Sequence, residues 1–85
     1  MSRSAEISAT DIDLAAAILT ATNIRPAARP GTDLAEFFFP NTEEVRSVMV
    51  AFSTGNLEQN VRRFAANRAW LYRLARQIAR TGGAR

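Results

Sequence analysis

The feature that most constrains the fold is a long amphipathic segment in the last third of the chain, which contains no proline. At about 100° per residue, its apolar side chains fall on one side of a single helix. They are Leu57, Val61, Phe64, Leu71, Leu74, Ala75 and Ile78. A helix with one apolar face needs a core on which to bury it. We therefore expect a helix over residues 57–80, capped by Asn56, and a core supplied by the rest of the chain.

Two shorter segments also predict helices. Residues 11–22 are apolar almost all round, which predicts a buried helix, and Thr10 and Asp13 have the spacing of a capping box at its start. A second helix is expected to begin near Thr42 and to end at Gly55, a residue type suited to helix termination. Its apolar positions follow the spacing i, i+3, i+4, i+7 of one helix face. They are Val45, Val48, Met49 and Phe52.

The segment between these two helices predicts a short β-hairpin. Pro26 and Pro30 restrict residues 23–29 to an edge strand or an extended loop, and a second strand over residues 34–39 ends at Pro40. Alternation places Phe37 and Phe39 on one face of this strand, with Ala35, and Phe38 on the other. Phe38 is then either covered by the long helix or exposed as a protein interface, including that of a homodimer.

These elements predict a single small α+β domain over residues 10–81. Their order is helix, β-hairpin, helix and long basic C-terminal helix. Residues 1–9 are small and polar without a period, so they are expected to be flexible, as are residues 82–85.

Composition argues against several classes of function. The chain has no cysteine and no histidine, so it lacks the usual zinc ligands and the commonest general base. Its serines and threonines have no histidine or lysine to activate them, and no glycine-rich phosphate loop is present. We expect neither catalysis nor a cofactor or metal. No apolar run approaches the about 20 residues that span a bilayer, so we expect a cytoplasmic protein without a membrane partner.

Charge is divided unevenly along the chain. All eleven basic residues are arginine. Residues 1–58 carry a net charge of −4, whereas residues 59–85 carry seven arginines and no acid. A GC-rich coding sequence would account for the absence of lysine, but it accounts less well for this segregation. The asymmetry indicates an acidic partner, such as nucleic acid.

The arginines of the long helix are the candidate binding residues. A narrow sector almost opposite the apolar face contains Arg62, Arg73, Arg76 and Arg80, and its borders hold Trp70, with Arg63 beside it, and Tyr72. Arginine binds phosphate or carboxylate bidentately, and the two aromatic rings can stack on unpaired bases. The alternative is that these arginines form an ordinary solvent-facing side. Arg68 lies nearer the apolar edge, from which we expect it to reach Glu43 or Glu44.

The same elements resemble a family of short bacterial and phage proteins defined only as a domain of unknown function. The resemblance covers about residues 11–76, through the strings DIDLAAAILTA and EFFFP and a last segment in which Phe52, Gly55, Leu57, Asn60, Arg62, Arg63 and Phe64 match the family pattern. The hairpin departs from that pattern, because Pro26 and Pro30 stand where members have a glycine-centred turn. The resemblance implies a phage or mobile-element context but no assigned activity.

The sequence therefore predicts a small non-catalytic protein of phage or mobile-element type. It is expected to bind an acidic macromolecule, nucleic acid first, through its arginine-rich C-terminal helix. The alternative is a protein–protein inhibitor or adaptor, for example an inhibitor of a host-defence nuclease complex of CRISPR type. Its partner would then be a nucleic-acid-binding protein complex.

Overall fold

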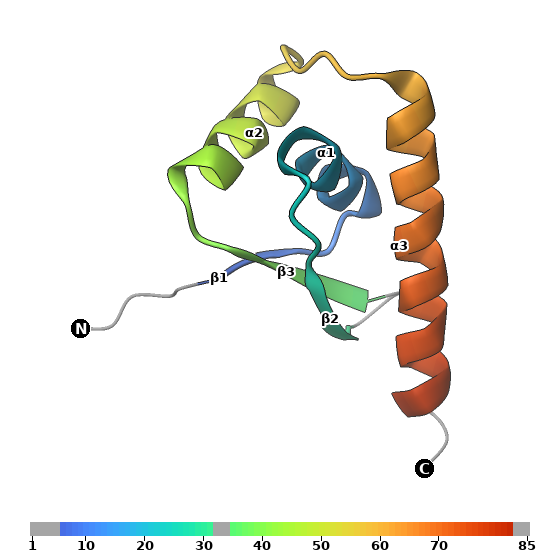
Figure 1. The fold of residues 1–85 in the computed structure, drawn as a ribbon. Helices are drawn as coiled ribbons and strands as arrows, with labels where there is room; N and C mark the ends of the chain where they lie inside the picture. Colours follow the sequence, from blue (N-terminus) through green and yellow to red (C-terminus); the bar gives the residue numbers. More distant parts are fainter. Residues whose placement is uncertain (1–5, 32–34, 83–85) are drawn as a thin grey trace, which may run out of the picture.

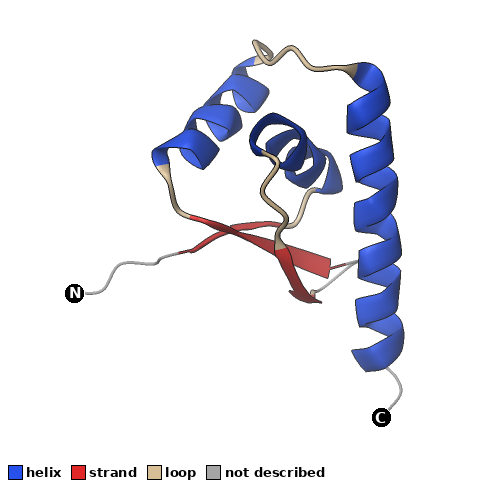
Figure 2. Cartoon of the chain, viewed as in Figure 1, coloured by secondary structure: helices blue, strands red, loops and turns tan. Residues whose placement is uncertain are grey.

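A computed structural model describes residues 6–31 and 35–82 of the chain. The elements follow one another as β1 (Glu6–Ala9), α1 (Ile12–Thr22), β2 (Ala27–Pro30), β3 (Ala35–Pro40), α2 (Glu43–Thr54) and α3 (Val61–Gly82). Figure 1 shows α1 and α2 above one face of the sheet, with α3 alongside both layers. The expected α+β class is confirmed, with helices and strands in separate layers (Figure 2).

The three strands form an antiparallel sheet in the order β1-β3-β2. The predicted pairing of β2 with β3 is present, but β1 is an additional strand on the other side of β3. The prediction that residues 1–9 are flexible is therefore wrong for Glu6–Ala9, whose Ile7 pairs with Phe39 and whose Ala9 pairs with Phe37. Residues 1–5 lie outside the described part of the chain, as does Leu34 of the predicted strand.

The two faces of β3 differ as the alternation predicts. Phe37 and Phe39 are fully buried, and Ala35 is 3% exposed. The opposite face carries Glu36 and Phe38, which are only half-buried. The sheet therefore contributes one apolar face to the core, and the aromatic side chains of that face lie beneath α1.

Helix α1 lies at the centre of the core. All of residues 15–20 are buried. Asp11 caps its start by accepting a hydrogen bond from the backbone N–H of Asp13, in place of the predicted capping box with Thr10. The last turn ends at Asn23, which takes the left-handed conformation with φ of 61°. Small side chains on α1 allow the sheet, α2 and α3 to approach it closely from different sides.

Helix α2 follows its predicted pattern closely. Thr42 is its N-cap, and the hydroxyl oxygen of Thr42 accepts from the backbone N–H of Val45. Val45 and Val48 are buried against the core. Gly55 ends the helix with φ of 77°, a left-handed conformation that favours glycine.

Helix α3 begins four residues later than the sequence indicates. Asn60, not Asn56, caps it, because the Asn60 side chain accepts from the backbone N–H of Arg63. Leu57 packs against the core from the preceding loop, and Val61 is 80% exposed instead of buried. The middle of the apolar face is as predicted, with Leu71 and Ala75 fully buried.

Polar contacts fix α3 and the preceding loop against α1. The Gln59 side chain donates to the carbonyl oxygen of Ala17 at 2.7 Å, and that of Asn67 donates to the Thr20 hydroxyl at 3.0 Å. Thr20 in turn donates to the Ala16 carbonyl, so its buried hydroxyl both accepts and donates a hydrogen bond. These contacts set the start of α3, and with it the rotation of the helix against the core.

We predict that Phe37→Ala lowers the free energy of unfolding by about 3–5 kcal/mol, because it leaves a cavity beneath α1. Urea unfolding followed by circular dichroism measures this loss, with Phe37→Leu as a milder variant. Phe38→Ala is the matched control, since the same side chain is lost from the opposite face. An equal loss from Phe38→Ala would contradict the assignment of the two faces.

Candidate functional site

Helix α3 carries most of the positive charge of the molecule. It holds six arginines and no acidic residue. The candidates Arg62, Arg63, Arg73, Arg76 and Arg80 are all exposed. Among the residues that the structure describes, no carboxylate pairs with any of these five. Their charge is therefore not neutralised by any carboxylate of the described residues.

These arginines fall into two groups instead of one continuous line. Arg62 is eleven residues from Arg73, which is about 16 Å along the helix axis. The same side of the helix carries only small exposed residues between them, namely Ala65, Ala66 and Ala69. Arg73, Arg76 and Arg80, which we term the arginine cluster, lie within about 10 Å of helix axis. The strongest local charge is therefore on the last turns of α3.

A surface hollow of about 430 Å³ lies beside the arginine cluster. The residues that line it are Trp70, Arg73, Leu74, Arg76, Gln77 and Arg80, and we term it the Trp70 hollow. Trp70 is half-buried and packs against the core, so one part of its ring is fixed while another part lines the hollow. The structure thus brings together Trp70 and three of the predicted arginines.

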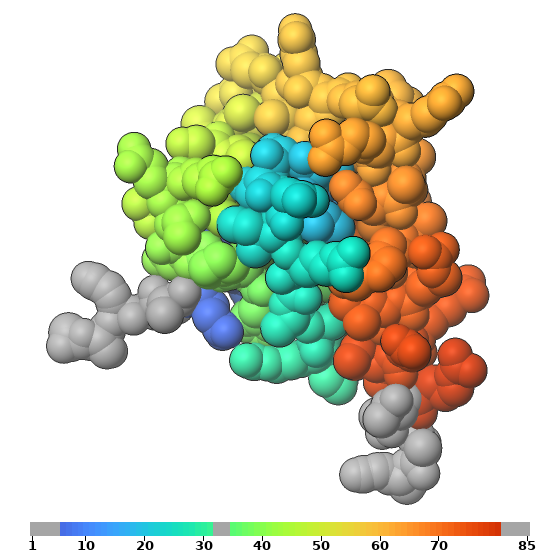
Figure 3. Space-filling model, in the orientation of Figure 1, coloured from blue at the N-terminus to red at the C-terminus, as the bar shows by residue number. Residues whose placement is uncertain are grey.

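Arg25 is a further cation at this site that the sequence analysis missed. It lies in the segment between α1 and β2, and its guanidinium carbon is 5.1 Å from the centre of the Trp70 ring. The space-filling view shows this segment and β2 against the C-terminal half of α3 (Figure 3). In sequence Arg25 is only a loop arginine before Pro26, and no local pattern indicates its approach to Trp70.

Tyr72 and Arg68 form a separate group on another side of α3. The Arg68 side chain donates to Asp13 of α1, so the expected contact with Glu43 or Glu44 is wrong. The hydrogen bond to Asp13 raises the pKa of Arg68 above its ordinary value. Arg68 is therefore charged at any accessible pH. Its guanidinium also lies over the ring of Tyr72, at 5.2 Å from the ring centre. Tyr72 is therefore not adjacent to the Trp70 hollow.

Phe38 is covered by an arginine of the neighbouring strand. The guanidinium carbon of Arg29 lies 4.1 Å from the centre of the Phe38 ring, and the same group forms an ion pair of 3.6 Å with Glu6 of β1. Arg29 thus reaches across the central strand of the outer face. Cover of Phe38 by α3 and an interface through this face both stay predictions.

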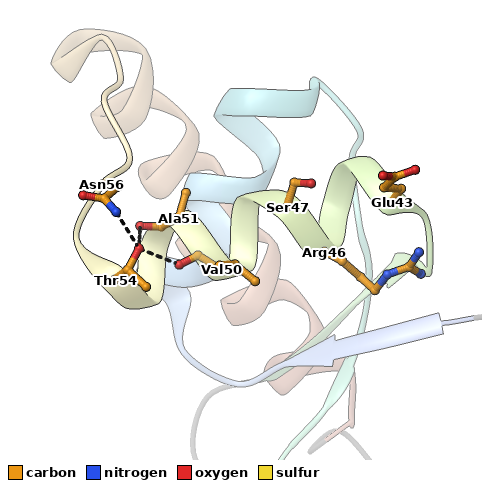
Figure 4. A pocket seen from close by; sticks show the side chains of 7 residues that line it. All are labelled: Glu43, Arg46, Ser47, Val50, Ala51, Thr54 and Asn56. Atoms are coloured by element: carbon orange, nitrogen blue, oxygen red, sulfur yellow. Dashed lines mark hydrogen bonds between the residues drawn. The ribbon is translucent and has the colours of Figure 1, made fainter.

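Another hollow lies on the outer side of α2 and has a volume of about 570 Å³. Figure 4 shows its side chains spread along α2 from Glu43 to Thr54, with Asn56 in the loop that follows. Its hydrogen bonds serve the end of the helix: the Thr54 hydroxyl donates to the Val50 carbonyl, and the Asn56 amide donates to the Thr54 oxygen. It brings together no group of side chains suited to a reaction.

In residues 6–31 and 35–82, no group of three acidic side chains is placed to hold a metal ion. None of the helices described has both the length and the apolar character needed to cross a bilayer.

Comparisons of the chain with family models, curated proteins and solved structures gave no significant match. The resemblance to a phage-type family of unknown function is thus still a prediction.

We predict that Arg68→Gln lowers the midpoint of thermal unfolding, because it removes the link between α3 and Asp13 of α1. Arg76→Gln is the matched control, since it removes the same charge from the same helix without breaking an ion pair. It should leave the midpoint unchanged or raise it slightly, because Arg76 is close to other cations. Equal losses in the two variants would contradict a structural role specific to Arg68.

Proposed function

We propose that this protein binds nucleic acid through the arginine cluster of α3. The observation that carries the proposal is the exposure of Arg73, Arg76 and Arg80 without a carboxylate partner among the described residues. A solvent-facing helix stabilises itself best when acids alternate with bases at i±4 spacing, and α3 has no acid. The uncompensated charge suits a polyanionic partner instead.

The spacing of the cluster supports phosphate binding. Its three guanidinium groups are distributed over about 10 Å of helix axis, and successive phosphates of one DNA strand rise by about 3.4 Å. The cluster therefore covers a length of about three phosphates. Guanidinium groups can form bidentate bonds to phosphate oxygens, which position a nucleic acid without reading its sequence.

A non-catalytic cytoplasmic role in a phage or mobile-element setting agrees with this proposal. It rests on the sequence resemblance and on composition, which lacks cysteine and histidine.

A second candidate is an inhibitor or adaptor that binds a protein, for example one that blocks a host-defence nuclease complex. The outer face of the sheet favours it, because α1 and α2 both lie on the opposite face (Figure 1). Phe38 and Arg29 would provide an aromatic and a charged contact there, either for a partner or for a second copy of the chain. Such an interface should depend on Phe38 and only weakly on salt.

We predict that the protein binds labelled oligonucleotides with an affinity that falls steeply as salt rises. The double variant Arg73→Gln/Arg76→Gln should bind more weakly. It should also reduce the slope of log affinity against log salt concentration by about 1.4 to 1.8, because each lost phosphate contact contributes about 0.7 to 0.9. Fluorescence anisotropy at several salt concentrations measures both quantities.

The control is Arg46→Gln, which removes one positive charge from α2, where Arg46 donates to Asn41. It should have less effect on the slope than the single variant Arg76→Gln. If no oligonucleotide binds at low salt, the nucleic-acid proposal is wrong. Loss of a captured partner or of a dimer in Phe38→Ser, with the arginine variants unaffected, would instead support the second candidate.

A further inference from the structure

We infer that the nucleic acid bound by this protein is single-stranded, and that one unpaired base occupies the Trp70 hollow. This inference rests on the proposed function and specifies its substrate class. The arginine cluster accounts for attraction to any polyanion, whereas the hollow adds an aromatic surface directly beside the cations. That combination is the one used for single strands, in which phosphates meet basic groups and bases stack on aromatic rings.

The composition of the hollow fits a nucleotide better than a phosphate alone. Trp70 and Leu74 supply apolar surface at the same place as the three arginines. Its volume of about 430 Å³ is within the range of pockets that hold small organic ligands, roughly 300–1,000 Å³. A base stacked on the indole would leave its phosphates close to Arg73, Arg76 and Arg80, which line the same hollow.

Arg25 prepares Trp70 for this contact. Its guanidinium carbon lies over the indole ring, 5.1 Å from the ring centre, and Arg25 is not among the residues that line the hollow. The core fixes a further part of the same side chain. Because the ring is held before a ligand arrives, little side-chain entropy is lost when a base stacks on it.

Tyr72 does not provide an equivalent platform. Like Trp70, it has a guanidinium over its ring, that of Arg68, which Asp13 also holds. Unlike Trp70, it does not line the hollow beside the arginine cluster. The structure therefore separates two aromatic residues that the sequence places equally at the borders of the arginine sector, and it assigns the stacking role to Trp70.

Duplex DNA fits this surface less well. In a duplex the faces of the bases are covered by their neighbours, so a base must leave the stack at a cost of a few kcal/mol before it can reach a recessed ring. A helix bound along a duplex groove also benefits from phosphate contacts over its whole length. On α3 the alanines at positions 65, 66 and 69 interrupt such a series between Arg62 and Arg73.

The test uses the intrinsic fluorescence of Trp70, which is the only tryptophan in the chain. The full chain is titrated at low salt with a deoxythymidine oligonucleotide, with an abasic oligonucleotide of equal length and charge, and with a duplex. We expect the thymidine strand to quench the fluorescence and to bind about tenfold or more tightly than the abasic strand. The duplex should bind more weakly than the thymidine strand and produce little quenching.

The outcomes separate this inference from the proposed function. Equal binding of thymidine and abasic strands without quenching would overturn the base site but leave nucleic-acid binding supported. Tighter binding of the duplex would do the same. Failure of all three ligands to bind would overturn both. Polyglutamate serves as a polyanion without bases. If it binds as tightly as the thymidine strand, the hollow and cluster accept any polyanion, and the base site is overturned.

Variants keep the test independent of folding defects. Trp70→Leu retains apolar bulk at the core edge, and labelled strands then report affinity by anisotropy. It should lose the preference for thymidine over abasic strands while still binding both, and Trp70→Phe should restore part of that preference. Tyr72→Leu is the matched control and should keep the full preference.

Arg25→Gln should reduce the preference and shift the Trp70 emission; an unchanged preference would contradict the role given to Arg25.

Discussion

Burial of α1 is the constraint on which the rest of the structure depends. Its residues 15–20 are all buried, and three of them are alanines that let neighbouring backbones approach closely. The sheet, α2 and α3 each cover a different side of this helix, so no two of them could form the core without it. Because α3 is one of these covering layers, its apolar face must turn inward, and its arginines must turn outward.

Side-chain contacts between α1 and α3 then define which part of α3 forms a site. Gln59, in the loop before α3, and Asn67 bond to α1, and Arg68 reaches Asp13, so this loop and the first two turns of α3 hold the helix against α1. The second half has its own neighbour in β2, and the segment before β2 brings Arg25 to Trp70. Structural and candidate binding arginines thus occupy one helix but different turns and different sides of it.

Much of the fold follows from local patterns, and the failures have identifiable causes. The all-round apolar character of α1 predicted a buried helix, and the alternation of Phe37, Phe38 and Phe39 predicted the two faces of β3. Each pattern was sufficient because it fits only one arrangement. Strand β1 was missed because four residues with two outward polar side chains look like a polar terminus, and only pairing with β3 makes them a strand.

The candidate site was predicted in part for the same reasons. The exposure of Arg73, Arg76 and Arg80 follows from helix periodicity. The approach of Arg25 to Trp70 and the pairing of Arg68 with Asp13 join residues far apart in sequence, so periodicity could not reveal them. Nor could it show that Asn60 instead of Asn56 starts α3, since that choice depends on the contact of Gln59 with α1.

The crowding of like charges on α3 has a consequence for the order of its last turns. Arg73 and Arg76 are spaced i, i+3, and Arg76 and Arg80 are spaced i, i+4, so each pair repels across one helical turn. Arg80, in the last turn, also has the fewest helical residues beyond it. A polyanion bound as proposed would neutralise that repulsion and stabilise the helix that holds it. Ligand occupancy and helix fraying at this end are then thermodynamically linked, so each reports on the other.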